Sequence, residues 1–252
     1  MPDSASAGTA TATKGVRITA VDTARGLAIL MMVAYHITFD IQYFGIAAID
    51  LNSLPLLLLQ RVTGTLFVMI AGVSLTLNES HNKEGYVHYL KRGLMLGAVA
   101  LLITIATWIY PHEGFIQFGV IDMLALSTLI APFFFRFGWV NLTLGAIIVL
   151  VGIWLGTSGI YVSTHALFWL GINDPGYYAL DNYPMLPWFG VVLIGIWLGQ
   201  TLFPAFTDVV MRIRVPGEDT LASLGKNSLV IYLVHQPLIV GIILLLQNHG
   251  IA

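Results

Sequence analysis

The sequence of 252 residues has no cysteine and little charge. The missing cysteines exclude disulfides, thiolate nucleophiles and thiolate metal ligands, and they leave the redox compartment undecided. Only 10% of the residues are charged, whereas 57% are hydrophobic. A soluble domain of this length needs far more charge on its surface, so the composition indicates an all-α integral membrane protein with several spanning helices.

The N-terminal residues also lack any hydrophobic run. Residues 1–15 read MPDSASAGTATATKG, a small and polar stretch without the apolar region of a signal peptide. We therefore expect a disordered tail over residues 1–16 and a single transmembrane domain over residues 17–252. Neither a further domain boundary nor an internal repeat is evident.

Apolar stretches of about 20 residues, the length that crosses a bilayer, occur seven times along the chain. They cover residues 20–43, 53–77, 87–110, 115–135, 139–157, 184–203 and 224–247. Residues 161–172 are shorter and more polar than these stretches. We interpret them as an interfacial or re-entrant part of an outer loop, with a short extra span as the alternative.

Basic residues are confined to one side of this seven-span arrangement. With the N-terminus in the cytoplasm, ten of the eleven basic residues fall inside and none lies in an external loop. The ten are Lys14, Arg17, Arg25, Lys83, Lys91, Arg92, Arg136, Arg212, Arg214 and Lys226. The external loops carry acidic residues instead, namely Asp40, Asp50, Glu113, Asp174 and Asp181. The positive-inside rule therefore predicts a cytoplasmic N-terminus, an external C-terminus and a location in the cell membrane.

The first span, VDTARGLAILMMVAYHITFD at residues 21–40, contains four residues that hydrocarbon excludes: Asp22, Arg25, His36 and Asp40. At about 100° per residue, the four lie within an arc of about 60° on a helix. Ionisable groups within a membrane face the interior of the bundle or a wet cavity, so we expect this stripe to face inward. Asp22 and Arg25 have the alternative role of capping and anchoring the helix at the cytoplasmic surface.

Three further spans also contain polar groups. Arg61 lies about 12 Å below the outer end of the second span, where a guanidinium needs a partner or a wet cavity. Asp122 lies in the fourth span, and the last span carries a second polar stripe of Ser228, Tyr232 and His235.

The depths of these groups predict a single central site built from four helices. His36, Asp40, Arg61 and Asp122 fall in the outer half of the membrane, and His235 falls near its middle. Each residue also has a structural alternative. Either histidine can bond a neighbouring helix, and Asp122 and Arg61 can form a buried ion pair that serves packing alone.

The segment RITAVDTARGLAILMMVAYHITFD resembles the opening helix of the heparan-α-glucosaminide N-acetyltransferase-like membrane family, whose pattern begins R-x-x-x-D-x-x-R-G. It is also similar to the first helix of the acyltransferase-3 group of O-acylating membrane enzymes, where a histidine ends the motif. Five later segments resemble the same family and follow in the expected order: TLFVMIAGVSLTL, YLKRGLMLGAVALLITIATW, IQFGVIDMLALS, YPMLPWFGVVLIGIWLG and LGKNSLVIYLVHQPLI. Together they cover most of residues 17–240.

The resemblance implies a membrane acyltransferase that moves an acyl group, in the first instance acetyl, from cytoplasmic acyl-CoA to a hydroxyl or amine presented outside. The implied acceptor is a glycan or an amino sugar, and the implied key residue is the histidine of the first-helix motif, here His36. The lysosomal branch uses a histidine further along, where this chain has the histidine-free stretch FGIAAIDLNS at residues 44–53. The acceptor of that branch is therefore not carried over.

The polar residues of the spans fit this chemistry. Neutral His36 would take a proton from the acceptor as the acceptor attacks the thioester. Asp40, one helical turn further on, would fix the tautomer of His36, and Arg61 or another donor would stabilise the oxyanion. Asp122 and His235 complete the set of candidate catalytic residues. Direct attack is the default mechanism, and an acyl-histidine intermediate is the alternative.

Acyl-CoA would be the donor substrate, and its phosphates need arginine and lysine donors. Five basic residues cluster at the predicted cytoplasmic mouth: Arg17, Arg25, Lys91, Arg92 and Arg136. Ordinary anchoring on the positive side of the membrane is the alternative role for each of them.

Other classes of protein explain fewer of these features. A multi-pass transporter of a small polar or anionic solute is the alternative function, although the inverted repeats and broken helices typical of transporters are not evident. A structural scaffold leaves the polar stripe unexplained, and a metal site lacks a local pair of ligands, so no metal is predicted. The expected partners are the lipid bilayer, acyl-CoA and the acceptor, without nucleic acid. The acceptor, the acyl chain length and the oligomeric state, a homo-oligomer included, stay open.

Overall fold

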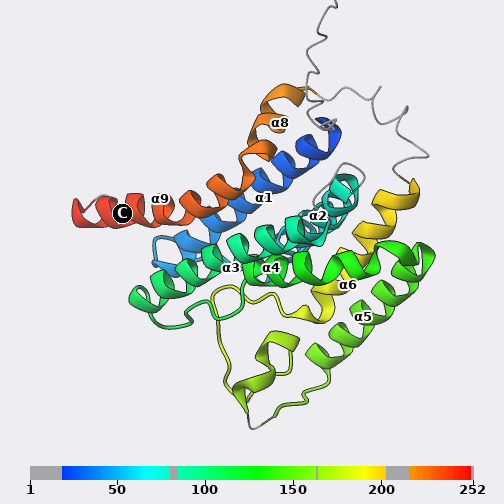
Figure 1. Ribbon diagram of the computed structural model, residues 1–252. Coiled ribbons are helices and arrows are strands. Elements are labelled where there is room, and N and C mark those ends of the chain that lie inside the picture. The colour runs from blue at the N-terminus through cyan, green and yellow to red at the C-terminus, as the bar shows by residue number, and fades with distance from the viewer. Residues whose placement is uncertain (1–18, 80–84, 163, 203–215, 251–252) are drawn as a thin grey trace, which may run out of the picture.

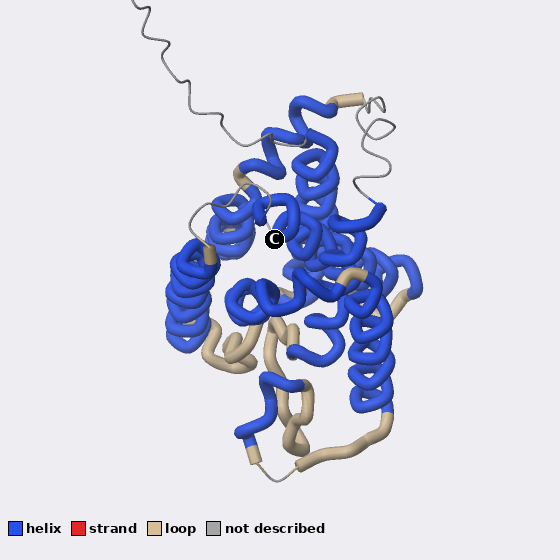
Figure 2. Tube along the Cα trace, turned by 45° about the vertical axis from the view of Figure 1, so that its right-hand side comes forward, coloured by secondary structure: helices blue, strands red, loops and turns tan. Residues whose placement is uncertain are grey.

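The computed structural model describes residues 19–79, 85–162, 164–202 and 216–250, and these residues form helices and loops without a strand (Figures 1 and 2). The helices in chain order are α1 (Thr19–Tyr43), α2 (Leu54–Glu79), α3 (Tyr86–Ile109), α4 (Val120–Ile130), η1 (Ala131–Phe137), α5 (Trp139–Thr157), η2 (His165–Leu170), α6 (Met185–Trp197), η3 (Leu198–Leu202), α8 (Glu218–Lys226) and α9 (Ser228–Asn248). The predicted N-terminal tail lies outside the described residues.

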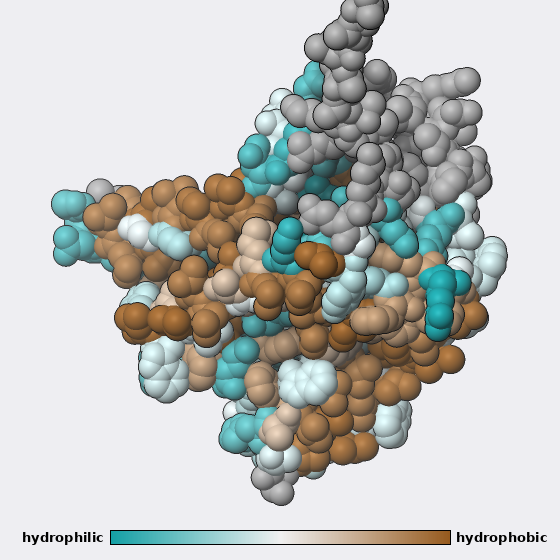
Figure 3. Space-filling view, viewed as in Figure 1, coloured by the Kyte–Doolittle hydropathy of each residue, from teal (hydrophilic) through white to brown (hydrophobic). Residues whose placement is uncertain are grey.

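The described helices confirm a multi-pass, all-α membrane bundle. Six of them are long and apolar enough to cross a bilayer, with α4 and η1 counted as one, and the apolar helix Met185–Thr201 is shorter. Figure 3 shows apolar side chains over α9 and over much of the visible face, as expected of helices that meet lipid.

The centre of the bundle is formed by α2 and α6. Helix α5 packs along α6, α3 packs along α4, and α1 lies against α2, α8 and the first part of α9 (Figure 1). Val68, Met123, Leu193 and Ile196, which come from α2, α4 and α6, are fully buried in one apolar core.

Glycine allows the closest helix contacts. A Cβ at Gly72 would collide with the carbonyl oxygen of Val192, and a Cβ at Gly195 would collide with that of Met69. The backbones of α2 and α6 therefore touch directly, as small residues permit in membrane bundles. Gly225 meets the carbonyl oxygen of Asp22 in the same way, so α8 lies directly on the first turns of α1.

Two predicted spans have different boundaries in the structure. The fourth begins at Val120 rather than at residue 115, because the backbone just before it pairs with the chain ahead of α6. Leu180 donates to the carbonyl of Gly114 at 2.7 Å, and Tyr183 donates to that of Phe118 at 3.1 Å. Backbone groups that are bonded across to another segment cannot also join a helix.

The seventh predicted span is divided. Residues 224–226 belong to the separate helix α8, and α9 begins after Asn227, whose backbone dihedral angles are not helical. Gly225, two residues before this break, is held against α1, so α8 stays on α1 while α9 starts anew after Asn227. Residues 161–172 contain only the short helix η2 and form no span among the described residues.

The two ends of the bundle carry different groups. The basic end is the end that carries Arg25, Lys91 and Arg92, where α1 and α3 begin and α2 ends. The opposite end carries residues 158–184, which connect α5 to α6 and which we call the outer lobe (Figure 1). The assignment of the basic end to the cytoplasm stays a prediction.

Candidate functional site

The polar stripe of α1 faces the interior of the bundle, as its periodicity predicted. Asp22 is 4% exposed and Asp40 is 1% exposed, although both lie in a helix with an apolar outer face. Arg25 bonds to α2 and α8, and His36 and Asp40 contact α9, whereas the carboxylate of Asp22 bonds to Arg25 within α1. The stripe therefore connects α1 to three neighbouring helices.

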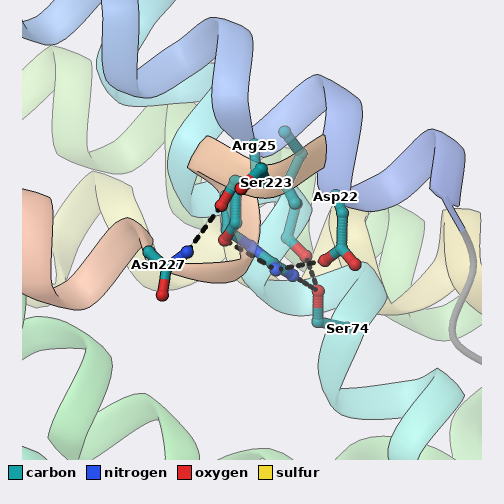
Figure 4. Close-up of polar contacts among 7 residues, drawn as sticks. Asp22, Arg25, Ser74, Ser223 and Asn227 are labelled. Atoms are coloured by element: carbon teal, nitrogen blue, oxygen red, sulfur yellow. Dashed lines mark hydrogen bonds and ion pairs between the residues drawn. The ribbon is translucent and has the colours of Figure 1, made fainter. Parts of the chain in front are cut away.

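At the basic end, Arg25 joins three helices (Figure 4). Its guanidinium donates to Asp22 Oδ1 at 2.8 Å within α1, to Ser74 Oγ at 2.6 Å on α2, and to the carbonyl of Gly225 at 3.5 Å on α8. A planar guanidinium has several N–H donors in a fixed fork, so it can bond to three acceptors on different helices at once better than the ammonium group of a lysine can. The contacts support a structural role for Arg25.

Half-way to the other end, two histidines meet face to edge. The rings of His36 on α1 and His235 on α9 have centroids 4.8 Å apart and planes at 81°. The Nδ1 atom of His36 lies 2.9 Å from the carbonyl oxygen of Met32, and that of His235 lies 2.7 Å from the carbonyl oxygen of Tyr232. A carbonyl only accepts, so Nδ1 carries the proton in each neutral ring and Nε2 is left as the basic nitrogen.

The structure corrects the expected role of Asp40. Its two carboxylate oxygens accept from Nε2 of Gln236 at 2.9 and 3.0 Å, and the backbone of α1 rather than Asp40 fixes the tautomer of His36. On α9, Gln236 follows His235 directly, so the Asp40–Gln236 pair sets the register between α1 and α9. Asp40 therefore positions the histidine pair through α9.

Asp122 also has a different setting from the one predicted. It lies in the first turn of α4, and its Oδ2 accepts from the backbone N–H of Gly119 at 3.0 Å. Its expected partner Arg61 is exposed on α2, and no ion pair between the two occurs among the described residues. A carboxylate at the start of a helix is satisfied by free N–H groups and by the helix dipole, so it needs no arginine.

A second carboxylate, Asp181 of the outer lobe, reaches the same helix start. Its Oδ2 accepts from the backbone N–H of Val120 at 3.1 Å and from the hydroxyl of Tyr232 at 3.5 Å. Burial raises the pKa of Asp181 to about 6, and the two hydrogen bonds partly offset this effect. A Cβ at residue 119 would meet Asp181 Oδ2, so glycine there leaves room for the carboxylate in its present position.

Tyr232 connects these groups. Its ring lies 5.7 Å from that of His235, its hydroxyl reaches Asp181, and its side chain lines a cavity of about 380 Å³ between α2, α3, α4 and α9. The predicted central site therefore consists of two neighbouring groups, the histidine pair and the carboxylates of Asp122 and Asp181 at the start of α4, with Tyr232 between them. Neither His36 nor His235 is among the residues that line the cavity.

The cavity runs to the basic end of the bundle. Arg25, Lys91 and Arg92 line it there, and its walls are mainly apolar side chains such as Phe67, with hydroxyl groups such as that of Thr128. The five residues predicted to bind the donor thus lie in three different places. Three line the cavity, Arg17 lies outside the described residues, and the exposed Arg136 stands 4.9 Å over the ring of Phe137 instead.

The sequence interpretation did not assign several residues of this region to the central site. Asp181 was placed in an external loop, and Ser74, Ser127 and Thr128 were not singled out, although all three line the cavity. The pattern Gly119-x-x-Asp122 at the start of an apolar run is a signal for the helix start that was available in the sequence. No local pattern marks Asp181 as its neighbour.

The fold and the site define a multi-pass membrane protein in which a cavity with a basic end reaches Tyr232, beside a pair of histidines of which His235 is buried. Among known families, residues 17–237 match the one described as heparan-alpha-glucosaminide N-acetyltransferase, catalytic. This match covers most of the chain, so the chain belongs to that family of membrane acetyltransferases, as the sequence resemblance implied. No curated protein and no solved structure matches the chain.

Proposed function

We propose that the protein transfers an acyl group, in the first instance acetyl, from a cytoplasmic acyl-CoA to a hydroxyl or amine of a glycan or amino sugar at the external face. One observation carries the proposal: the cavity has basic side chains at one end and Tyr232, the neighbour of His235, along its wall. The basic end would face the cytoplasm, in agreement with the positive-inside rule.

The walls of the cavity match the parts of the donor. Lys91 and Arg92 at the basic end would bind the phosphates of CoA through charge-assisted hydrogen bonds. The hydroxyl groups of Ser127 and Thr128 suit the amide groups of the pantetheine arm. The apolar walls beyond them would hold the arm and deliver the thioester towards Tyr232.

The chemical step is a direct transfer. As the hydroxyl or amine of the acceptor attacks the thioester carbonyl, Nε2 of His36 takes its proton; the C–S bond breaks and CoA leaves as the thiolate. His36 is suited to this role because Nδ1 is occupied by the carbonyl of Met32, which leaves Nε2 as the base. The hydroxyl of Tyr232 replaces Arg61 as the donor to the oxyanion, since Tyr232 lines the cavity and its single proton can turn from the 3.5 Å contact with Asp181 to the oxyanion.

Transport of a small polar solute is the competing function. Membership in an acetyltransferase family does not favour transport. The two functions also differ in products, because only acyl transfer consumes a thioester. Release of free CoA thiol that depends on an added acceptor therefore distinguishes them.

The proposal is tested first by ligand-induced stabilisation of the purified protein. Acetyl-CoA should raise the melting temperature, because a ligand present at about 100 times its Kd stabilises the folded state by about 2.7 kcal/mol. Acyl-CoA thioesters of increasing chain length would then report how long a chain the cavity accepts, with ATP as a control for phosphate binding alone. Absence of stabilisation by every CoA thioester would contradict the proposed donor.

A further inference from the structure

The outer lobe contains a second cavity, separate from the one at the basic end. It has a volume of about 270 Å³ and lies between the end of α5 and residues 171–177. Four of the ten residues that line it are glycines, which expose their backbone amides, and two are tyrosines, Tyr161 and Tyr177. Asn173 and Asp174 complete a polar wall. A site with this lining is unlike the apolar interior of the bundle.

Three of the lining residues carry buried polar atoms that lack a hydrogen-bond partner among the described residues. These atoms are Oδ1 of Asn173, Oδ1 of Asp174 and the hydroxyl oxygen of Tyr177. Nδ1 of His165 lies 3.3 Å from Oδ1 of Asp174, but without the alignment of a hydrogen bond. Buried polar groups are almost always hydrogen-bonded, so three such atoms without a hydrogen bond, of which only Asp174 Oδ1 has an ion-pair contact, indicate a place where a ligand supplies the missing hydrogen bonds.

We propose that this cavity binds one sugar ring of the acceptor. Two of the three unpaired atoms are carbonyl or carboxylate oxygens, so the ligand must bring hydrogen-bond donors, as hydroxyl and ammonium groups do. The volume lies near the lower limit of ordinary ligand sites, which fits a single ring rather than a longer molecule. Tyr161 and Tyr177 provide aromatic faces for the C–H groups of such a ring.

The same segment connects the cavity to the inner site. Tyr177 lines the cavity, and four residues later Asp181 bonds to the start of α4 and to Tyr232. A sugar ring bound against Tyr177 would thus touch the segment 177–181, and Asp181 at the end of this segment contacts Tyr232 in the wall of the cavity proposed for the donor. The identification of the ring as part of the acceptor rests on the proposed function; binding of the ring itself does not.

The test measures sugar binding without any donor. Purified protein in nanodiscs is titrated with glucosamine and, separately, with glucose, and saturation-transfer NMR reports the bound sugar. The two sugars share a ring and differ in one group, an ammonium in glucosamine and a hydroxyl in glucose. Stronger binding of glucosamine would mean that the Asp174 carboxylate binds the ammonium, and equal binding would mean that it binds a hydroxyl common to both. We expect Asp174→Asn and Asn173→Ala to weaken binding about tenfold, the loss expected for a hydrogen bond to a charged or buried group.

Asp50→Asn is the matched control, because Asp50 is an exposed acid of another external loop and accepts only a local turn bond from Asn52. It should leave sugar binding unchanged. Saturable binding in the wild type that is lost in the two cavity variants, with unchanged melting curves, supports the inference. No saturable binding of either sugar, or equal binding by the wild type and the cavity variants, overturns it.

Failure of the inference and failure of the proposed function give different results. If the acceptor site lies elsewhere, the cavity variants still transfer acyl groups with the KM of the wild type for the acceptor. If the protein is no acyltransferase, CoA thioesters neither stabilise it nor are consumed, whatever the sugar titrations show.

Discussion

The two ends of α1 use polar residues in opposite ways. At the basic end, the guanidinium of Arg25 is held by groups from α1, α2 and α8 (Figure 4). In the second half of α1, the ring of His36 lies next to that of His235, whose Nε2 is buried without a hydrogen-bond partner among the described residues. A fully paired polar group stabilises the fold, whereas an unpaired one costs stability and is retained where chemistry needs it.

The outer lobe extends this contrast. It connects to the bundle through Asp181, which is paired, yet it carries the unpaired atoms of the second cavity. The unpaired buried atoms include those of His235 and of the outer lobe, on the route that an external acceptor would take, and others elsewhere in the bundle, such as Thr23 Oγ1 on the first turns of α1 and Asn141 Oδ1 on α5. The comparison predicts that loss of the paired Arg25 side chain lowers stability, and that loss of His36, beside the unpaired nitrogen of His235, lowers activity.

The largest expected effect is on catalysis. His36→Ala should lower kcat at least about 100-fold, because a positioned general base contributes about 10²- to 10⁴-fold. The melting temperature should change little, since the side chain of His36 bonds only to the backbone of its own helix. Acceptor-dependent release of CoA thiol measures the rate.

His112→Ala is the matched control for that experiment. Nδ1 of His112 lies 2.8 Å from the carbonyl of Trp108, four residues earlier, just as His36 bonds to Met32, but His112 is exposed at the end of α3. It should keep the wild-type rate. Near wild-type transfer by His36→Ala would exclude His36 as the base.

The next effect is on stability. Arg25→Ala should lower the free energy of unfolding by about 2 kcal/mol, somewhat less than a fully buried pair, because the Arg25 side chain is 20% exposed. The loss leaves Asp22 and Ser74 without their shared donor. Thermal unfolding in detergent measures it, with the exposed Arg61→Ala as control. An unchanged melting temperature would contradict the structural role of Arg25.

A smaller effect, on KM for acyl-CoA, tells whether the basic residues bind the donor or only anchor the helices at the membrane surface. Lys91→Ala and Arg92→Ala should each raise KM for acyl-CoA about tenfold with little change in kcat, because a charge-assisted hydrogen bond to phosphate is worth about 1.5–3 kcal/mol. Arg136→Ala removes the same charge outside the cavity and should leave KM unchanged. Equal effects of all three would mean that general charge, rather than the cavity, attracts the donor.

The smallest effect concerns pH. Burial raises the pKa of Asp181 to about 6 from an ordinary value of 3.8, so the folded protein binds this proton more tightly than the unfolded chain does. The contribution of Asp181 to stability is therefore complete below pH 3.8 and is lost as the pH rises through about 6. Thermal unfolding between pH 4 and 7 should show this decline in the wild type. If Asp181→Asn shows the same decline, another group is responsible.

Some of this site was readable from the sequence because the relevant signals are local. Hydropathy over about 20 residues located the spans, and the helical period placed Asp22, Arg25, His36 and Asp40 on one inward face. Both signals need only the residues of one helix. They failed where a distant segment intervenes, as at residues 115–119, which pair with the outer lobe instead of joining α4.

The amino-acid sequence alone thus determined that the chain is a bundle of membrane helices, with basic groups at one end and an ionisable stripe on its first helix. Only the tertiary structure decided that His36 meets His235, that Asp40 bonds to Gln236 rather than to His36, and that Asp181 reaches the start of α4. The physical reason is that hydropathy and helical period fix which face of a helix turns inward. Which residue it meets there depends on how closely the backbones approach at glycines such as Gly225 and Gly119, and on the register between helices far apart in the chain.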